Sequence, residues 1–305
     1  MQPEIVYSLR TRAEELFRSL QDDITSTLEV LDGGEKFFQE TWHRPGGGGG
    51  RTRVMTEGDI FEKAAVNFSA VHGDAPDSMN STEKGLHFFA TGISLVLHPR
   101  SPKIPTVHAN FRYFEQSSGE SWFGGGTDLT PYYLDEEDAF HFHHTLKTAC
   151  DKHDAAYYPR FKKWCDEYFY IKHREEARGI GGIFFDNLTG STERDREKIF
   201  AFVQDAAHAF LPAYVPIVEK HRTEHYSEKE RRWQLLRRGR YVEFNLVYDR
   251  GTRFGLETQG RIESILVSLP SVARWEYDIH PDPGSPEATL EEVLKSPRDW
   301  ALGIL

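Results

Sequence analysis

The stretch SLVLHPRSPKIPTVHANFRYFEQSSGESWFGGGTDLTPYY, residues 94–133, decides the fold of this chain. Its first half contains three prolines. They exclude a helix, because proline has no backbone N–H and its ring collides with the preceding helical turn. Apolar and polar residues alternate on either side of the prolines. The pattern therefore predicts two strands, residues 87–98 and 106–115, joined by a proline-rich loop.

The polar side chains of each strand fall on one face. Because side chains alternate across a strand, His108, Asn110 and Arg112 share a face, and so do Ser94 and His98. A solvated face is the simpler interpretation for an antiparallel strand, but such faces consist mostly of Lys, Glu and Thr. If the two polar faces come together, their hydroxyl, imidazole, amide and guanidinium groups form a floor suited to a buried anionic ligand.

Helical and strand-like segments occur in blocks along the chain. Helical periodicity covers residues 3–30, 135–152, 156–174, 192–222, 227–238 and 287–295. Strand-like runs cover residues 52–55, 64–71, 87–98, 106–115, 120–126, 180–186, 240–248 and 262–269. Runs of strands favour an α+β fold, with a large, mainly antiparallel sheet flanked by helices on both faces. No Pro/Ser-rich linker is present, so we expect residues 1–305 to form a single domain and Gly46–Gly50 to form a loop.

Composition argues against several classes of protein. The net charge of −11 and the pI near 5.7 disfavour nucleic acid as a partner, since binding to phosphates needs a basic surface. No run approaches the roughly 20 apolar residues of a membrane span, and the first residues lack a signal-peptide core. The two cysteines, Cys150 and Cys165, exclude a cysteine-based metal cluster and favour a reducing compartment. We expect a cytoplasmic protein.

One carboxylate and three arginines are candidates for chemistry. Asp128 follows Gly124–Gly126, where a turn or helix-cap role and a role as a base are equally consistent with its position. Arg112, Arg178 and Arg261 lie in strand-like segments or Gly-rich turns. Arginine binds carboxylates through two parallel hydrogen bonds, so the three predict a substrate with several carboxylates. Surface ion pairing is the alternative.

The fourteen histidines raise the question of a metal site. The chain has no HExxH helix motif and no clear 2-His-1-carboxylate spacing. A hydrogen-bonded structural role is therefore the better interpretation for any one of them. The glycine clusters match neither the dinucleotide-binding pattern nor the P-loop pattern, so nucleotide binding has no support.

Several long blocks resemble the oxygen-dependent coproporphyrinogen III oxidases. They include WFGGGTDLTPYY and YPRFKKWCDEYFYIKHREEARGIGGIFFDNL, and together they cover residues 86–115, 122–133, 158–188, 239–270 and 275–288. The resemblance implies oxidative decarboxylation of two propionates of coproporphyrinogen III to vinyl groups, which gives protoporphyrinogen IX and carbon dioxide with O2 as co-substrate. It also implies a homodimer whose flat antiparallel sheet is flanked by helices.

The resemblance also implies roles for single positions. His108 matches the family's proposed proton donor, and the active-site charged residues match Arg112, Asp128 and Arg178. A substrate-binding segment matches Ser94, Asn110, Phe111 and Arg112. A binding turn, usually Gly-Gly-Arg, matches Gln259, Gly260 and Arg261, where Gln259 is a departure that puts a backbone contact in question. Histidines proposed as metal ligands in bacterial members match His98, His108, His143 and His173.

The residues and the resemblance together imply a mechanism. Asp128 accepts a hydrogen bond or a proton from the pyrrole N–H groups, oxygen attacks the electron-rich ring, and loss of carbon dioxide leaves the vinyl group. The arginines hold propionates. The reduced tetrapyrrole supplies the electrons, so neither a metal nor an organic cofactor is expected. Two other classes remain open: a non-haem metal-dependent oxygenase, and a non-catalytic tetrapyrrole-binding protein.

Overall fold

Seven strands form one antiparallel sheet in the order β1-β2-β3-β4-β5-β6-β9. The computed structural model describes residues 8–74, 86–257 and 261–302. The strands are β1 (Phe38–His43), β2 (Gly48–Thr56), β3 (Phe61–Asp74), β4 (His87–Pro99), β5 (Thr106–Gln116), β6 (Ser121–Thr130) and β9 (Gly181–Leu188). A separate two-stranded sheet pairs β7 (Tyr170–Ile171) with β8 (Glu176–Ala177).

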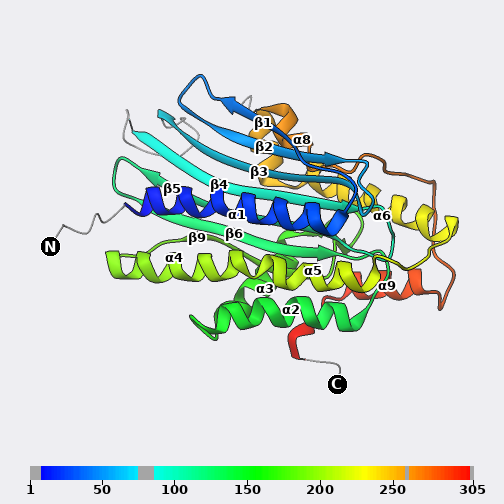
Figure 1. Cartoon of the computed structure of the whole chain (residues 1–305). Coiled ribbons are helices and arrows are strands. Elements are labelled where there is room, and N and C mark those ends of the chain that lie inside the picture. Colours follow the sequence, from blue (N-terminus) through cyan, green and yellow to red (C-terminus); the bar gives the residue numbers. More distant parts are fainter. Residues whose placement is uncertain (1–7, 75–85, 258–260, 303–305) are drawn as a thin grey trace.

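Helices cover both faces of the large sheet, which confirms the predicted α+β class. The helices are α1 (Leu9–Asp32), α2 (Glu136–Asp151), α3 (Tyr157–Tyr168), α4 (Glu193–His208), α5 (Phe210–His221), α6 (Glu228–Val247), α7 (Arg250–Glu257), α8 (Ile262–Leu266), α9 (Pro286–Lys295) and a final 3-10 turn (Trp300–Leu302). Helices α1, α4 and α5 lie on one face, and α6 and α8 lie on the opposite face (Figure 1). None of the helices in the described ranges is both long and apolar enough to cross a bilayer.

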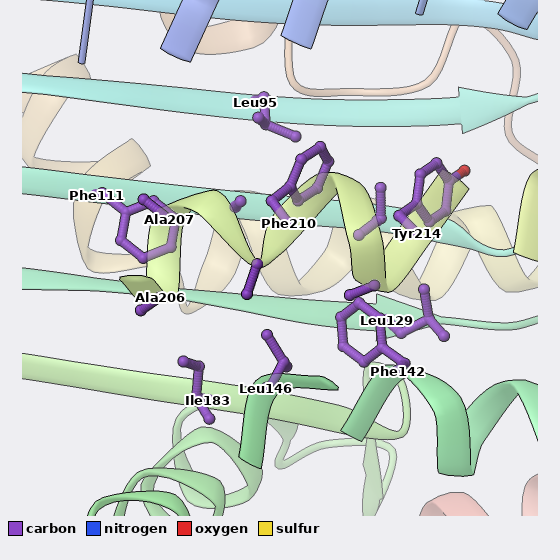
Figure 2. Packing of buried hydrophobic residues seen from close by; sticks show 14 of the residues in the cluster. Leu95, Phe111, Leu129, Phe142, Leu146, Ile183, Ala206, Ala207, Phe210 and Tyr214 are labelled. Atoms are coloured by element: carbon purple, nitrogen blue, oxygen red, sulfur yellow. The ribbon is translucent and has the colours of Figure 1, made fainter. Parts of the chain in front are cut away.

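The hydrophobic core lies between the sheet and the helices α1, α2, α4 and α5. Apolar side chains that point from the strands to this side include Leu95, Phe111, Leu129 and Ile183. Figure 2 shows them packed against α2 and the α4–α5 pair. Burial of this apolar surface is the main driving force for folding, and it fixes the register, since a slip of one residue would turn every side chain to the other face.

The second face of the sheet meets α6 and α8 through specific polar and aromatic contacts. Asn67 of β3 donates a hydrogen bond to the Ser264 carbonyl of α8 at 3.3 Å. The ring of His98 on β4 lies edge-on to Tyr241 of α6, with centroids 5.2 Å apart. This side of the sheet therefore carries the polar residues of the predicted floor, and α6 and α8 border it.

Two predicted strands are wrong, because both segments are helical. Residues 240–247 form the end of α6, with Tyr248 as its C-cap, and residues 262–266 form α8. Helix α6 begins at a capping box in which Ser227 and Glu230 bond to each other's backbone N–H groups. The helix continues through the apolar run 240–248, whose pattern fits both periods. Tertiary contacts decide here, since Tyr241 and Phe244 are buried on one side of the helix.

Other segments differ in their ends. The predicted helix 192–222 is two helices that meet at Ala209, because Pro212 cannot donate the backbone bond that would continue α4. The predicted helix 156–174 ends at Tyr168. Gly48–Gly50 belong to β2 rather than to a loop. A β-carbon at Gly50 would lie 2.3 Å from the Trp42 ring, so this strand position needs glycine.

Candidate active site

The sheet brings the polar residues of β4, β5 and β6 onto one surface. Ser94 lies directly opposite Asn110, and His108 lies directly opposite Asp128. Arg112 lies two residues beyond Asn110 on β5, so its side chain points to the same side of the sheet. We call this set the polar face: Ser94, His108, Asn110, Arg112 and Asp128. All but Asp128 are half-buried, so the polar face is open to a ligand as the alternation pattern predicted.

Glycines make room beside Arg112. Gly92 of β4 and Gly124 of β6 are its register partners on either side. A β-carbon at Gly124 would lie 2.6 Å from Asp186 Oδ1 and 2.9 Å from Arg112 Nε. Any larger residue at position 124 would therefore displace the Arg112–Asp186 ion pair, which spans 2.9 Å across the sheet surface.

Asp128 is held from two directions. Nη2 of Arg178 lies 2.8 Å from both of its carboxylate oxygens. Nδ1 of His108 lies 2.9 Å from Oδ1. Because an ionised carboxylate can only accept a hydrogen bond, Nδ1 of His108 is the donor, and Nε2 is the acceptor of the neutral imidazole. Within the described residues, Nε2 of His108 makes no hydrogen bond, so it is the atom of this pair that a ligand on the polar face can reach.

The charge state of Asp128 follows from its surroundings. Burial raises the pKa of a carboxyl, but the positive charge of Arg178 and the hydrogen bond from His108 outweigh burial and leave the pKa of Asp128 below its ordinary value. Asp128 is therefore ionised at neutral pH although its side chain is 1% exposed. His108, whose side chain is 20% exposed, is the member of this pair that reaches the surface.

Arg178 does not lie on the polar face. Its side chain is 2% exposed, and its Nη1 donates to Asn245 Oδ1 at 2.8 Å. Three aromatic rings, Phe169, Tyr241 and Phe244, surround the guanidinium at 4.1–4.8 Å. In this arrangement Arg178 neutralises Asp128, and both of its terminal nitrogens bond to protein groups, so neither is free for the propionate that the sequence led us to expect there.

The other two arginines are accessible. Arg112 is 40% exposed and bonds to Asn110 at 3.1 Å as well as to Asp186. Arg261 begins α8 and pairs with Glu40 of β1 at 2.5 Å. The two guanidinium groups thus lie over different strands, β5 and β1, on the same side of the sheet. Of the three predicted arginines, these two can be reached by a carboxylate from solution.

One of the predicted substrate-binding residues, Phe111, points to the core and not to the polar face. The side chain of Phe111 lies on the core face and is 2% exposed, because it alternates with Asn110 and Arg112. Ser94 and Asn110 do lie on the polar face. Gln259 and Gly260 fall outside the described residues.

The four candidate metal-binding histidines do not come together. His98 bonds to Thr106 and to the Ser268 carbonyl, and burial together with the nearby charge of Arg238 holds its pKa well below the ordinary value. His143 bonds to Tyr158 and to the Ile180 carbonyl, and burial lowers its pKa to about 3. His173 bonds to Tyr248 and Glu243. Each of these rings uses both nitrogens on a different part of the fold, so among the described residues they form no common ligand set.

A single group of three potential ligands occurs in the described part of the chain, and it lies elsewhere. Asp135, Asp138 and His221 converge where α2 begins and α5 ends. The ammonium of Lys220 already lies 2.8 Å from Asp135 and 2.9 Å from Asp138. The cluster is therefore a salt-bridge network that ties the two helices together.

Sequence reasoning missed two residues of the site. Asn245, which binds Arg178, lies in the segment taken for a strand. Asp186 was given no role from sequence, and its pairing with Arg112 depends on the adjacency of β6 and β9. Neither has a local sequence signal.

An ionised carboxylate behind an imidazole, next to reachable arginines, is the arrangement expected of an acid–base enzyme site for a carboxylate-bearing ligand. Comparison with known proteins gives the particular family. The family model for coproporphyrinogen III oxidase matches residues 12–300. The chain belongs to the coproporphyrinogen III oxidase family.

Curated relatives match nearly the whole chain. It is 55% identical to the oxygen-dependent coproporphyrinogen-III oxidase of Drosophila melanogaster, over 96% of this chain and 78% of the relative. It is 52% identical to coproporphyrinogen-III oxidase 1, chloroplastic, of Arabidopsis thaliana, over 96% of this chain and 80% of the relative. A chloroplastic enzyme of Glycine max is also 52% identical, with the same coverage.

Proposed function

We propose that the chain catalyses the oxygen-dependent oxidative decarboxylation of coproporphyrinogen III to protoporphyrinogen IX, a step of haem biosynthesis. Its family and its near-full-length relatives support the reaction. The structural observation that carries the proposal is the buried Asp128–Arg178 pair behind His108, next to Arg112 on the polar face. A substrate with acidic side chains and pyrrole N–H donors matches these groups.

His108 moves the proton. Its Nε2 accepts the proton of a pyrrole N–H, and the ionised Asp128 stabilises the imidazolium that forms. Loss of the proton makes the ring electron-rich, so that O2 can attack it. Return of the proton from His108 restores the ring after decarboxylation. Asp128 thus acts through His108, which refines the sequence-based view of Asp128 as the direct acceptor.

Each decarboxylation is a two-electron oxidation. The propionate CH2CH2COO⁻ becomes CH=CH2 as its C–COO bond breaks, CO2 leaves and the β-carbon loses one hydrogen. O2 takes up both electrons, that hydrogen and one further proton, and leaves as hydrogen peroxide. Because the substrate supplies all the electrons, we propose that no resident metal or organic cofactor takes part. The engagement of both nitrogens of His98, His143 and His173 with other groups supports this view.

Arg112 and Arg261 hold propionates. Both are partly exposed on the side of the sheet that carries the polar face, and both are paired with a carboxylate, Asp186 or Glu40. A propionate can replace or share these partners without burial of a lone charge. Two anchors over different strands fix which side chain of the macrocycle lies over His108, and such positioning lowers the barrier by restricting the reactants.

Two features of the working enzyme complete the proposal. We propose a homodimer, since the edge strand β1 leaves backbone groups that a partner can cover. We also propose a cytoplasmic location, which fits the two buried free thiols, Cys150 and Cys165. Relatives in plants carry chloroplastic names, so fractionation of the native cells, with an antibody to the chain, decides the location.

Turnover in air tests the function. Purified protein with coproporphyrinogen III should release two CO2 per macrocycle and form protoporphyrinogen IX under air, with no turnover under nitrogen. A protein that binds the tetrapyrrole without turnover is a carrier, and a protein that turns over only with an added metal ion is a metal-dependent oxygenase. Either result contradicts the proposal.

A further inference from the structure

Among the described residues, helix α6 hydrogen bonds to Arg178, the buried partner of Asp128, through one side-chain amide. Asn245, near the end of α6, accepts a hydrogen bond from Arg178 Nη1 at 2.8 Å. The other terminal nitrogen of Arg178 binds both oxygens of Asp128. Asn245 is 5% exposed and Arg178 is 3% exposed. The chain of contacts therefore runs from Asn245 through Arg178 and Asp128 to His108 without a break.

The aromatic rings around Arg178 hold the guanidinium in place but do not fix its rotation, which the Asn245 amide does. Phe169, Tyr241 and Phe244 pack around the guanidinium, and such contacts favour a position of the cation more than a rotation. Within the described residues, Asp128 and Asn245 are the side chains that hydrogen bond to the guanidinium. Bonds to its two terminal nitrogens from opposite partners set its rotation, and hence the line along which it meets Asp128.

Because the Asn245 side chain is uncharged, it does not compete with Asp128 for the charge of Arg178. A carboxylate at this position would share the positive charge of Arg178 with Asp128. An amide oxygen accepts the same hydrogen bond but leaves the full charge for Asp128. The pairing of the single positive charge of Arg178 with the single negative charge of Asp128 keeps Asp128 ionised. An ionised Asp128 holds the Nδ1–H tautomer of His108.

We propose that Asn245 is a positioning residue for the reaction, which fixes Arg178 against Asp128 so that His108 presents Nε2 to the substrate. This inference rests on the proposed role of His108. Asn245 itself does not touch the polar face, so its removal should change the rate of the chemical step and not the binding of substrate. The same reasoning predicts a change in the imidazole of His108 even when no substrate is present.

Two variants and one matched control test the proposal. Asn245→Ala removes the acceptor, and Asn245→Asp keeps it but adds a second negative charge. Gln234→Ala is the control: Gln234 is a buried amide on the same helix that donates to the Pro99 carbonyl at 2.9 Å, and among the hydrogen bonds of the described residues it has none to Arg178. The measurements are kcat and KM in air, the thermal midpoint, and the ¹⁵N shifts of His108, which report the position of its proton.

Both Asn245 variants should lower kcat by about 10-fold to 100-fold, the scale for a misplaced catalytic group. They should leave KM within about 2-fold and move the ¹⁵N shifts of His108. Gln234→Ala should move neither kcat nor these shifts beyond what its loss of stability explains. Unchanged His108 shifts in folded Asn245→Ala would overturn the inference, as would an equal loss of kcat in the control.

The outcome separates this inference from the proposed function. If the Asn245 variants shift the His108 resonances but keep wild-type turnover, Asn245 positions His108, but this positioning does not serve the reaction, and the inference is contradicted. Wild-type protein that fails to turn over in air would contradict the proposed function, whatever the NMR result.

Discussion

One nitrogen of Arg178, Nη2, lies 2.8 Å from each oxygen of Asp128, and both side chains are almost completely buried. Transfer of two charges out of water is costly, and their attraction repays the cost only with good geometry and further hydrogen bonds. His108 and Asn245 supply those bonds. A change at either charged residue leaves the other buried and unpaired, so stability and catalysis must be measured separately in any variant of this pair.

Asp128→Asn should lose both turnover and stability. We expect kcat to fall by on the order of 100-fold or more, the scale for loss of acid–base assistance, because the neutral amide no longer stabilises the imidazolium of His108. We expect unfolding to become easier by about 3 kcal/mol, since Arg178 is left as an unpaired buried charge. Single-turnover assays and denaturant unfolding measure the two effects.

The double variant Asp128→Asn with Arg178→Met separates these effects. Replacement of both charges should restore much of the stability and none of the turnover. Near-wild-type kcat in the single variant would show that Asp128 has no catalytic role.

Arg112→Ala and Arg261→Ala should weaken substrate binding. Each removes a charge-assisted hydrogen bond to a propionate, worth about 1.5–3 kcal/mol, and the expected result is a raised KM. Arg18→Ala is the matched control, because Arg18 pairs with Glu14 on α1 over the opposite face of the sheet. A methyl-ester analogue of the substrate should bind more weakly than the acid. Equal binding of ester and acid would show that charge pairing is not the basis of recognition.

Removal of metal ions should leave aerobic activity intact. Enzyme treated with chelator and checked by elemental analysis should turn over in air and stop under nitrogen. His173→Gln should keep near-wild-type kcat, since the two ring nitrogens of His173 bond to Tyr248 and Glu243, away from the polar face. His108→Ala should lose activity. Activity that disappears with the chelator and returns with one metal ion would restore the metal-dependent alternative.

Light scattering should give a mass of about twice the 35.1 kDa of the chain if the edge strand is covered by a second copy. A mass that stays at one chain across a wide range of protein concentration would exclude the homodimer.

The polar face could be predicted from sequence because it depends on local geometry. The alternation of His108, Asn110 and Arg112 with core residues fixes their common side, and prolines fix the ends of the strands. The pairing of His108 with Asp128 needed only the adjacency of two consecutive strands.

The surroundings of Arg178 could not be predicted in this way. Its partner Asp128 lies 50 residues away in sequence, and Asn245 lies 67 residues away. The segment 240–248 satisfies the helical and the strand period together, and only its packing on His98 and Phe169 decides for the helix. The sequence therefore predicted Arg178 to be a free cation. In the structure Arg178 is buried by the end of α6, a segment that was predicted to be a strand.

Acid should destabilise the fold in a window set by buried histidines. Burial lowers the pKa of His143 from 6.5 to about 3. Between these values the unfolded chain binds a proton that the folded chain does not, so the free energy of unfolding falls as the pH falls below about 6.5. Each pKa unit corresponds to about 1.4 kcal/mol, and from pH 7 to pH 5 His143 alone should cost about 2 kcal/mol of stability. Denaturant unfolding at both pH values measures this loss.

His143→Gln should reduce that loss by about 2 kcal/mol, because glutamine binds no proton in the unfolded chain. His221→Gln is a control for which we expect the opposite change in the pH dependence of stability. The hydrogen bond to Asp138 raises the pKa of His221 above its ordinary value, so the folded chain holds its proton more tightly than the unfolded chain, and the stability that His221 contributes is lost as the pH rises through its folded pKa. Without His221 the decline toward pH 5 should be steeper than in wild type. Equal slopes in all three proteins would show that neither histidine changes its proton affinity on folding.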